Sequence, residues 1–141
     1  MSNDVDVTTE SGREIRERLM GTGDAPGDND WARVRSYNDQ WSDLNDLIDE
    51  VTWGRIYTRP GLSLRDRSLC VIVVHVTQRN WEHFRIHVGG AKRIGTTREE
   101  LGEAIIQLLF YVGLPSVREG LRILDEVYGD DDIQPNPGAE R

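Results

Sequence analysis

The sequence predicts an all-α protein whose helices are joined by short turns. Apolar residues recur at spacings of three and four between Trp31 and Val127, which is the period of a helix with one buried face. Ser63, Asn80 and Thr97 each stand where a helix N-cap is expected, just before such an apolar segment. Clean alternation of apolar and polar residues, the pattern of a half-buried strand, is missing. These observations favour stacked helical hairpins.

The first 30 residues are expected to form a flexible extension with one short helix. The segment Gly21–Asp30 is rich in Gly, Asp, Asn and Pro, which favour turns and exposed coil. Before it, Ser11 is placed to cap a helix, with Glu14 completing a capping box. The apolar stripe of that helix is narrow and consists of Ile15 and Leu19.

The helical domain is expected to span residues 31–128. Its first segment, Trp31 to Tyr57, has the pattern of an amphipathic helix that Gly54 interrupts. The run from Leu69 to Val76 is ambiguous, because its β-branched apolar residues also suit a buried strand. The capped start at Ser63 favours a helix there, one that is apolar on all sides and therefore central to a bundle or an interface.

The remaining helices are better defined by their ends. One is expected from Asn80 to about Arg93, and a second begins at Thr97 with Glu100 in a capping box. Gly113 and Pro115 should end the second, whose core stripe includes Leu101, Ala104, Ile105, Leu108 and Leu109. A last helix is expected from about Ser116 to Val127, followed by a disordered tail at residues 129–141.

Composition limits the partners and the compartment. A formal net charge of −8 and the lack of a continuous basic patch argue against nucleic-acid or anionic-membrane partners. The chain has no apolar run long enough to span a bilayer and no signal-peptide core, so a cytoplasmic protein is expected. The single cysteine, Cys70, cannot form an internal disulfide and is expected to be buried and inert.

The three histidines are the main candidates for chemistry. His83 and His87 stand four residues apart, on one face of the same expected helix. His75 and His83 are nearly equidistant from the turn that joins two helices, so all three rings could converge. Such a cluster could transfer protons without a metal, could hold Zn²⁺ or Fe²⁺ with an open coordination position, or could be structural.

Other side chains are candidates for supporting roles. Glu103, on the following helix, could orient a histidine or could be solvated surface. Arg85 could bind a substrate carboxylate or form an exposed salt bridge. Trp81 could line a pocket beside the histidines, although it could equally belong to the core or an interface, as could the aromatic residues Trp53, Phe84, Phe110 and Tyr111.

Three segments between Trp53 and Val127 resemble the carboxymuconolactone decarboxylase family, within the AhpD-like superfamily. They are the R-P-G-L-x-x-R-x-R-S-L motif that starts at Arg59, the G-T-T-R-E-E helix start at Gly95, and Y-V-G-L-P from Tyr111. The resemblance implies an all-α AhpD-like bundle of about six helices that assembles as a homo-oligomeric ring, a trimer or hexamer. It also implies a cofactor-free decarboxylation of 4-carboxymuconolactone, as in the catabolism of aromatic compounds.

The resemblance assigns roles to individual residues as well. It implies that His87 matches the family histidine and that Glu103 matches the family glutamate after the glycine turn. His83 departs from the pattern, because the decarboxylases usually have a glutamate there and the peroxidase-type members have the second cysteine of Cys-x-x-Cys. Asn80 occupies the place of the first cysteine, which argues against thiol peroxidase activity.

The leading hypothesis is a lyase or isomerase acting on a small cyclic carboxylated or enolisable substrate. His83, His87 and Glu103 would be catalytic, and Arg85, Trp81 and His75 would bind the substrate, without a cofactor or metal. One alternative is a metal-dependent enzyme with His75, His83 and His87 as ligands. The other is a non-catalytic, ring-forming binding protein.

Overall fold

The computed structural model describes residues 9–22 and 42–129, and every regular element in these ranges is helical. Seven α-helices and one π-helical segment lie there, without a β-strand, which confirms the predicted all-α class. None of these helices is both long and apolar enough to cross a membrane. The chain divides into two compact units, residues 1–67 and 68–141. Residues 1–8, 23–41 and 130–141 lie outside the described ranges, so the predictions for the extension and tail there stay predictions.

The first unit contains helix α1 (Thr9–Met20) packed against a second helical segment. This segment begins as α3 (Ser42–Leu47) and continues as the π-helix η2 (Ile48–Ile56). The helices approach each other where Gly12 meets Gly54, because a Cβ atom on Gly12 would lie only 2.6 Å from the Gly54 nitrogen. Helix α1 begins at Thr9 rather than after Ser11, so the predicted cap is wrong.

The π-helix was not expected from the sequence. An amphipathic helix was expected from Trp31 to Tyr57, but the described part changes from the α to the π hydrogen-bond pattern at Ile48. Residues 31–41 are outside the described ranges. Arg16 of α1 is buried and forms an ion pair with Asp49 of η2, which satisfies both charges in the helix contact.

Helix α4 (Leu64–Gln78) settles the ambiguous apolar run as a helix. Ser63 caps it, since the Ser63 hydroxyl accepts a hydrogen bond from the Asp66 backbone N–H at 3.0 Å. Ile72 and Val76 are buried at the four-residue helical spacing. The expectation of a buried Cys70 is wrong: the thiol is exposed, because position 70 lies on the face opposite Ile72.

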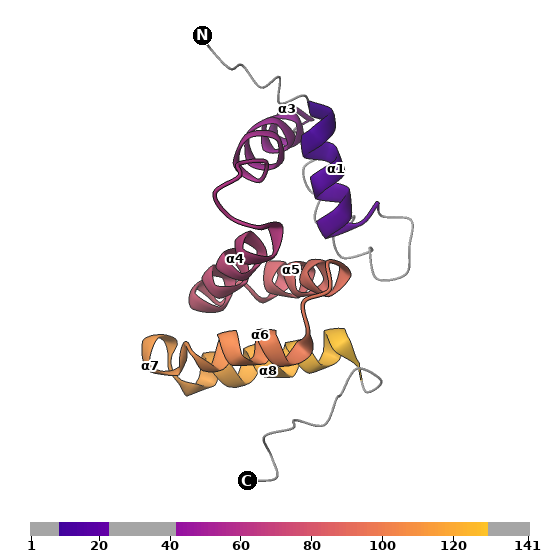
Figure 1. Ribbon diagram of the computed structural model, residues 1–141. Helices are drawn as coiled ribbons and strands as arrows, with labels where there is room; N and C mark the ends of the chain where they lie inside the picture. The colour runs from indigo at the N-terminus through magenta and orange to yellow at the C-terminus, as the bar shows by residue number, and fades with distance from the viewer. Residues whose placement is uncertain (1–8, 23–41, 130–141) are drawn as a thin grey trace. The chain divides into compact units, whose positions relative to one another are not determined.

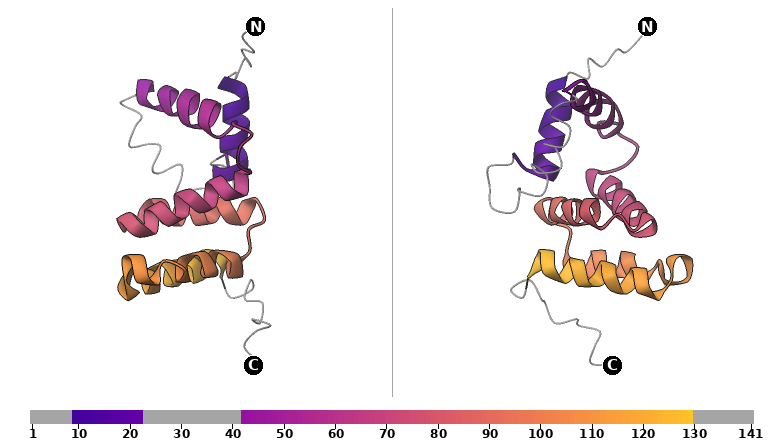
Figure 2. Two further views of the ribbon diagram at one scale, coloured as in Figure 1. Left: turned by 60° about the vertical axis from the view of Figure 1, so that its left-hand side comes forward. Right: turned by 180° about the vertical axis from the view of Figure 1, so that it is seen from behind.

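The second unit continues with α5 (Trp81–Arg93), α6 (Arg98–Ile106), α7 (Leu109–Val112) and α8 (Leu114–Tyr128). Figures 1 and 2 show α4 and α5 side by side in one layer, with α6 and α8 side by side in the next. The predicted capping box of Thr97 and Glu100 is present. Helix α8 begins at Leu114, two residues earlier than expected, and Pro115 occupies its first turn, where a missing N–H has no cost.

A single apolar core holds the second unit together. Phe84, Leu101 and Leu124 are fully buried at its centre, one each from α5, α6 and α8, and a buried side chain of this size contributes about 1.5 to 3 kcal/mol. The predicted stripe on α6 is shorter than expected, because the helix ends at Ile106. Phe110 and Tyr111 do not belong to this core: they are 96% and 79% exposed.

Candidate active site

The helical hairpin of α4 and α5 positions the three histidines. His75 lies in the last turn of α4, whereas His83 and His87 lie one turn apart on α5. The connection between the helices is short, consisting of Arg79 and Asn80. The chain therefore folds back at once, and residues at similar distances from the connection become neighbours.

The three imidazole rings form one cluster, called here the histidine cluster (His75, His83 and His87). The ring centroid of His75 lies 5.6 Å from that of His83 and 4.9 Å from that of His87. All three side chains are partly buried. The structure thus brings together the histidines that the hairpin argument placed near one another, with His75 between the two from α5.

Asn80 fixes the orientation of one ring. Its side-chain oxygen caps α5 by accepting the backbone N–H of His83 at 3.4 Å, and it lies 3.1 Å from Nδ1 of the same residue. Because the contact with a backbone N–H identifies the amide atom as oxygen, the facing Nδ1 must carry a hydrogen. The tautomer with this hydrogen on Nδ1 presents a lone pair at Nε2, the arrangement of a proton acceptor.

The other two rings have nitrogens without partners. Nδ1 of His75 and Nδ1 of His87 are buried and form no hydrogen bond with any part of the chain that the structure describes. Buried polar atoms are normally satisfied, and exceptions often mark places where a water, ion or substrate binds. These two nitrogens are therefore candidates for contact with a ligand.

Burial and repulsion between the rings disfavour the charged forms of His75 and His87. Burial, with smaller effects of His75 and His83, lowers the pKa of His87 to about 3. The pKa of His75 is also lowered, by burial and then by His83. Among the described residues, no Asp or Glu side chain contributes to the pKa shift of His75 or of His87. At neutral pH, His87 is a neutral imidazole.

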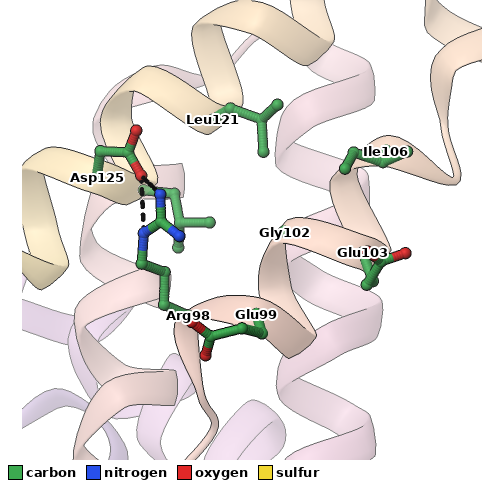
Figure 3. Close-up of a pocket in the computed structure, with 8 residues that line it drawn as sticks. Arg98, Glu99, Gly102, Glu103, Ile106, Leu121 and Asp125 are labelled. Atoms are coloured by element: carbon green, nitrogen blue, oxygen red, sulfur yellow. Dashed lines mark hydrogen bonds and ion pairs between the residues drawn. The ribbon is translucent and has the colours of Figure 1, made fainter. Parts of the chain in front are cut away.

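Glu103 lies apart from these contacts. It is exposed on α6 and lines a pocket of about 300 Å³ between α6 and α8, to which the histidines do not contribute. Figure 3 shows Arg98 reaching across this pocket to Asp125 of α8, and the Nε atom of Arg98 donates to the Asp125 carboxylate at 2.9 Å. Glu103 forms no hydrogen bond with a histidine in the described ranges. Its predicted role as an orienter of histidine stays a prediction.

The two other predicted substrate-binding residues of α5 differ in their surroundings. Trp81 packs edge-on against Phe84, with ring centroids 5.8 Å apart, and also lines a smaller pocket. Arg85 forms an ion pair with Glu126 of α8, which was the second of the two alternatives considered for it. Its guanidinium is therefore already engaged with a carboxylate.

A metal centre gains no support from the described residues. Among them, no group of three His, Cys, Asp or Glu side chains is arranged to hold a metal ion, although the three rings of the histidine cluster are close. Zinc sites need ligand nitrogens aimed at a common point about 2.0 to 2.1 Å away. Proximity of the ring centres alone does not satisfy this requirement.

Two features of the site were missed by sequence reasoning. Asn80 was expected to cap α5, but its contact with the His83 ring was not foreseen. Arg79 was not expected to have a particular role, yet it adopts a left-handed backbone conformation with φ of 54° and its Nε donates to Ser116. The only available signal was an arginine immediately after a helix end, where glycine is preferred.

The second unit is thus an all-α unit that carries a histidine cluster at the turn of a helical hairpin. The pattern of the carboxymuconolactone decarboxylase family matches residues 42–126. The protein belongs to the carboxymuconolactone decarboxylase family. The match runs through the sequence of both compact units and includes all three histidines.

Three relatives are similar in sequence to this chain, and two of them are named as decarboxylases. The chain is 29% identical over 124 residues to a 4-carboxymuconolactone decarboxylase from Acinetobacter baylyi, covering 88% of this chain and 89% of that protein. It is 33% identical over 85 residues to a nitrosuccinic acid decarboxylase from Metarhizium robertsii, covering 60% and 59%. An uncharacterized 15.0 kDa protein from Paracoccus denitrificans is 31% identical over 85 residues, covering 59% and 63%. The chain thus spans about three fifths of the last two relatives.

Proposed function

We propose that the protein is a decarboxylase-type lyase that acts on a small carboxylated, enolisable substrate, cyclic in the leading hypothesis. The observation that carries this proposal is the histidine cluster, with buried unpartnered nitrogens on His75 and His87. Two relatives support it, since one is named for 4-carboxymuconolactone and the other for nitrosuccinic acid. Both named substrates are carboxylic acids, and both relatives are named as decarboxylases.

The proposed reaction requires one proton donor. The bond between the carboxylate and its carbon breaks, CO₂ leaves, and the electron pair passes into the adjacent electron-withdrawing group to give an enolate-like anion. A histidine then donates a proton to this anion, and solvent returns a proton to the histidine. The net change is the replacement of a carboxylate by a hydrogen, which consumes one proton and needs no oxidant.

The substrate itself would supply the charge that the cluster lacks. In the free protein the lowered pKa of His87 leaves this ring without a proton to donate at neutral pH. A carboxylate about 4 Å away, at an effective dielectric constant of 20, is worth about 4 kcal/mol, which raises a histidine pKa by about three. Binding would therefore bring the ring into the range where general acid catalysis is efficient.

His83 and His87 have different parts in this proposal. The contact between Asn80 and Nδ1 leaves Nε2 of His83 as the acceptor, so His83 can take a proton from solvent or substrate. His87, more deeply buried, would deliver the proton to carbon. His75 lies beside both rings and would contact the substrate, while Glu103 would act from the following helix only if the bound state brings it closer.

The experiment is an assay of CO₂ release by the purified full chain from 4-carboxymuconolactone and from nitrosuccinate. Wild type should release CO₂ from at least one of them, and His87→Gln should lower kcat by about a hundredfold or more, the usual contribution of a general acid. Cys70→Ser, on an exposed position of α4, is the matched control and should keep full activity.

The same assay separates the two alternatives. Loss of activity with a chelator, and its return with Zn²⁺ or Fe²⁺, would favour the metal-dependent enzyme with three histidine ligands. Absence of CO₂ release from both substrates, with His87→Gln differing from wild type only in stability, would favour the non-catalytic binding protein. Either result would contradict metal-free histidine catalysis.

A homo-oligomer, as a trimer or hexamer, is part of the proposal. It is supported by a group of exposed apolar side chains around α7, which includes Phe110, Tyr111 and Leu114. Large exposed apolar groups that adjoin one another usually mark interaction sites. Native mass spectrometry of wild type and Phe110→Asp tests this point, and a monomeric wild type would refute it.

A further inference from the structure

Arg79 has a backbone conformation that its side chain disfavours. Its φ is 54°, and it is the one non-glycine residue with positive φ in the described ranges. It follows the end of α4, where its own N–H donates to Val76 and the next N–H, of Asn80, donates to His75. Glycine is preferred at this position because it has no Cβ. Residues in such disfavoured backbone conformations are concentrated at functional sites.

One nitrogen of the Arg79 guanidinium forms a hydrogen bond, and the other two are available to a ligand. Its Nε donates to the hydroxyl of Ser116 at 3.1 Å, and Ser116 is buried in the first turn of α8. Among the described residues, no carboxylate bonds to Arg79. The two terminal nitrogens are therefore available as a fork, the geometry that binds a carboxylate with two parallel hydrogen bonds.

A small pocket lies at this guanidinium. It has a volume of about 150 Å³ and is lined by Arg79, Trp81, Pro115, Ser116 and Glu119. Water occupies about 30 Å³ per molecule in the liquid, so the pocket has room for a carboxylate and a short apolar stem. Trp81 and Pro115 supply apolar walls for such a stem.

The acidic member of the lining does not compete for Arg79. Glu119 accepts hydrogen bonds from Arg122 on both of its oxygens, at 2.9 and 2.6 Å. This bidentate contact satisfies its charge on the same helix. Arg85, the arginine expected from the sequence to bind substrate, is paired with Glu126, so Arg79 is the more available cation.

We propose that Arg79, with Trp81 and Ser116, forms a binding subsite for a carboxylate of the substrate that is not lost as CO₂. The inference rests on the proposed function, because a substrate with a second carboxylate is assumed. The subsite and the histidine cluster share one connection: His75 precedes Arg79 by one helical turn, and Asn80 contacts the His83 ring. A dicarboxylate could therefore place one group in each.

The test uses the full chain with succinate as an unreactive dicarboxylate probe, by isothermal titration calorimetry, and compares Tm values. Arg79→Gly should keep or raise Tm, because glycine suits the left-handed backbone, yet should weaken succinate binding at least tenfold, as expected for lost hydrogen bonds to a charged group. Arg79→Lys should be intermediate, since lysine keeps the charge without the fork. Arg118→Gln, which removes an exposed arginine of α8, should bind as wild type does.

A purely structural role predicts a different result. If Arg79→Gly and Arg79→Gln both bind succinate as wild type does, the subsite is refuted, and wild type without saturable succinate binding refutes it too. The CO₂ assay separates this inference from the proposed reaction. If the Arg79 variants lose succinate binding and wild type releases no CO₂, the proposed reaction is refuted and the subsite is supported. If Arg79→Gly releases CO₂ with an unchanged KM, the reaction is supported and the subsite is refuted.

Discussion

The buried histidine of the cluster should make folding stability depend on pH in a defined window. The pKa of His87 is about 3 in the folded protein, mainly because of burial, against an ordinary value of 6.5. Below pH 6.5 the unfolded chain therefore binds a proton that the folded chain does not. The stabilisation is complete above this pH and is lost as the pH falls from 6.5 towards 3.

The expected size follows from these two values. Between about pH 7.5 and about pH 5, the difference in proton binding at His87 lowers the free energy of unfolding by about 2 kcal/mol. This is an upper figure, because part of the side chain is accessible to solvent. His75, whose pKa is lowered as well, contributes in the same direction.

Urea unfolding followed by far-ultraviolet circular dichroism measures this effect. Wild type should lose stability between the two pH values, and His87→Gln should lose about 2 kcal/mol less, because glutamine does not titrate. Comparing each variant with itself at two pH values removes the direct cost of the substitution. Cys70→Ser should behave as wild type. An equal loss in wild type and His87→Gln would refute the assignment of His87 as a buried neutral imidazole.

Two further predictions concern helix packing and capping. Gly12→Ala should destabilise the first unit by about 2 kcal/mol or more, because the added Cβ would lie 2.6 Å from the Gly54 nitrogen. Gly61→Ala should be tolerated, because no atom lies within 4 Å of the Cβ that it adds. Thermal unfolding compares the stabilities of the two variants. Thr97→Ala should lower the free energy of unfolding by about 1 kcal/mol, because α6 loses the capping box with Glu100. Unchanged stability, or unchanged amide exchange in the first turn of α6, would contradict this prediction.

Much of the fold could be predicted because local signals agreed with the tertiary structure. The Thr97 capping box and the Ser63 cap both mark real helix starts. The Ser63 cap also decided the nature of the following β-branched run, where periodicity gave no answer. The proximity of the three histidines could be predicted, because they lie on either side of the turn that joins two helices.

Other features depend on contacts between distant residues and left no local signal. The π-helix lies where Gly54 meets Gly12 of another helix, which no single segment encodes. Cys70 was placed on the wrong side of α4 because, in a run that is apolar throughout, the buried face cannot be told from the exposed one. The conformation of Arg79 was missed because glycine, the usual signal for a left-handed helix end, is absent.

The most direct test of the proposed site is nuclear magnetic resonance of the histidine rings while 4-carboxymuconolactone is added. The chain contains three histidines, so each ring gives its own signal and the spectrum reports the whole cluster. If the cluster binds and protonates the substrate, all three signals should shift with saturation, and the His87 signal should move towards the protonated form near pH 7. Saturable binding that leaves the three signals unchanged would contradict the proposed site.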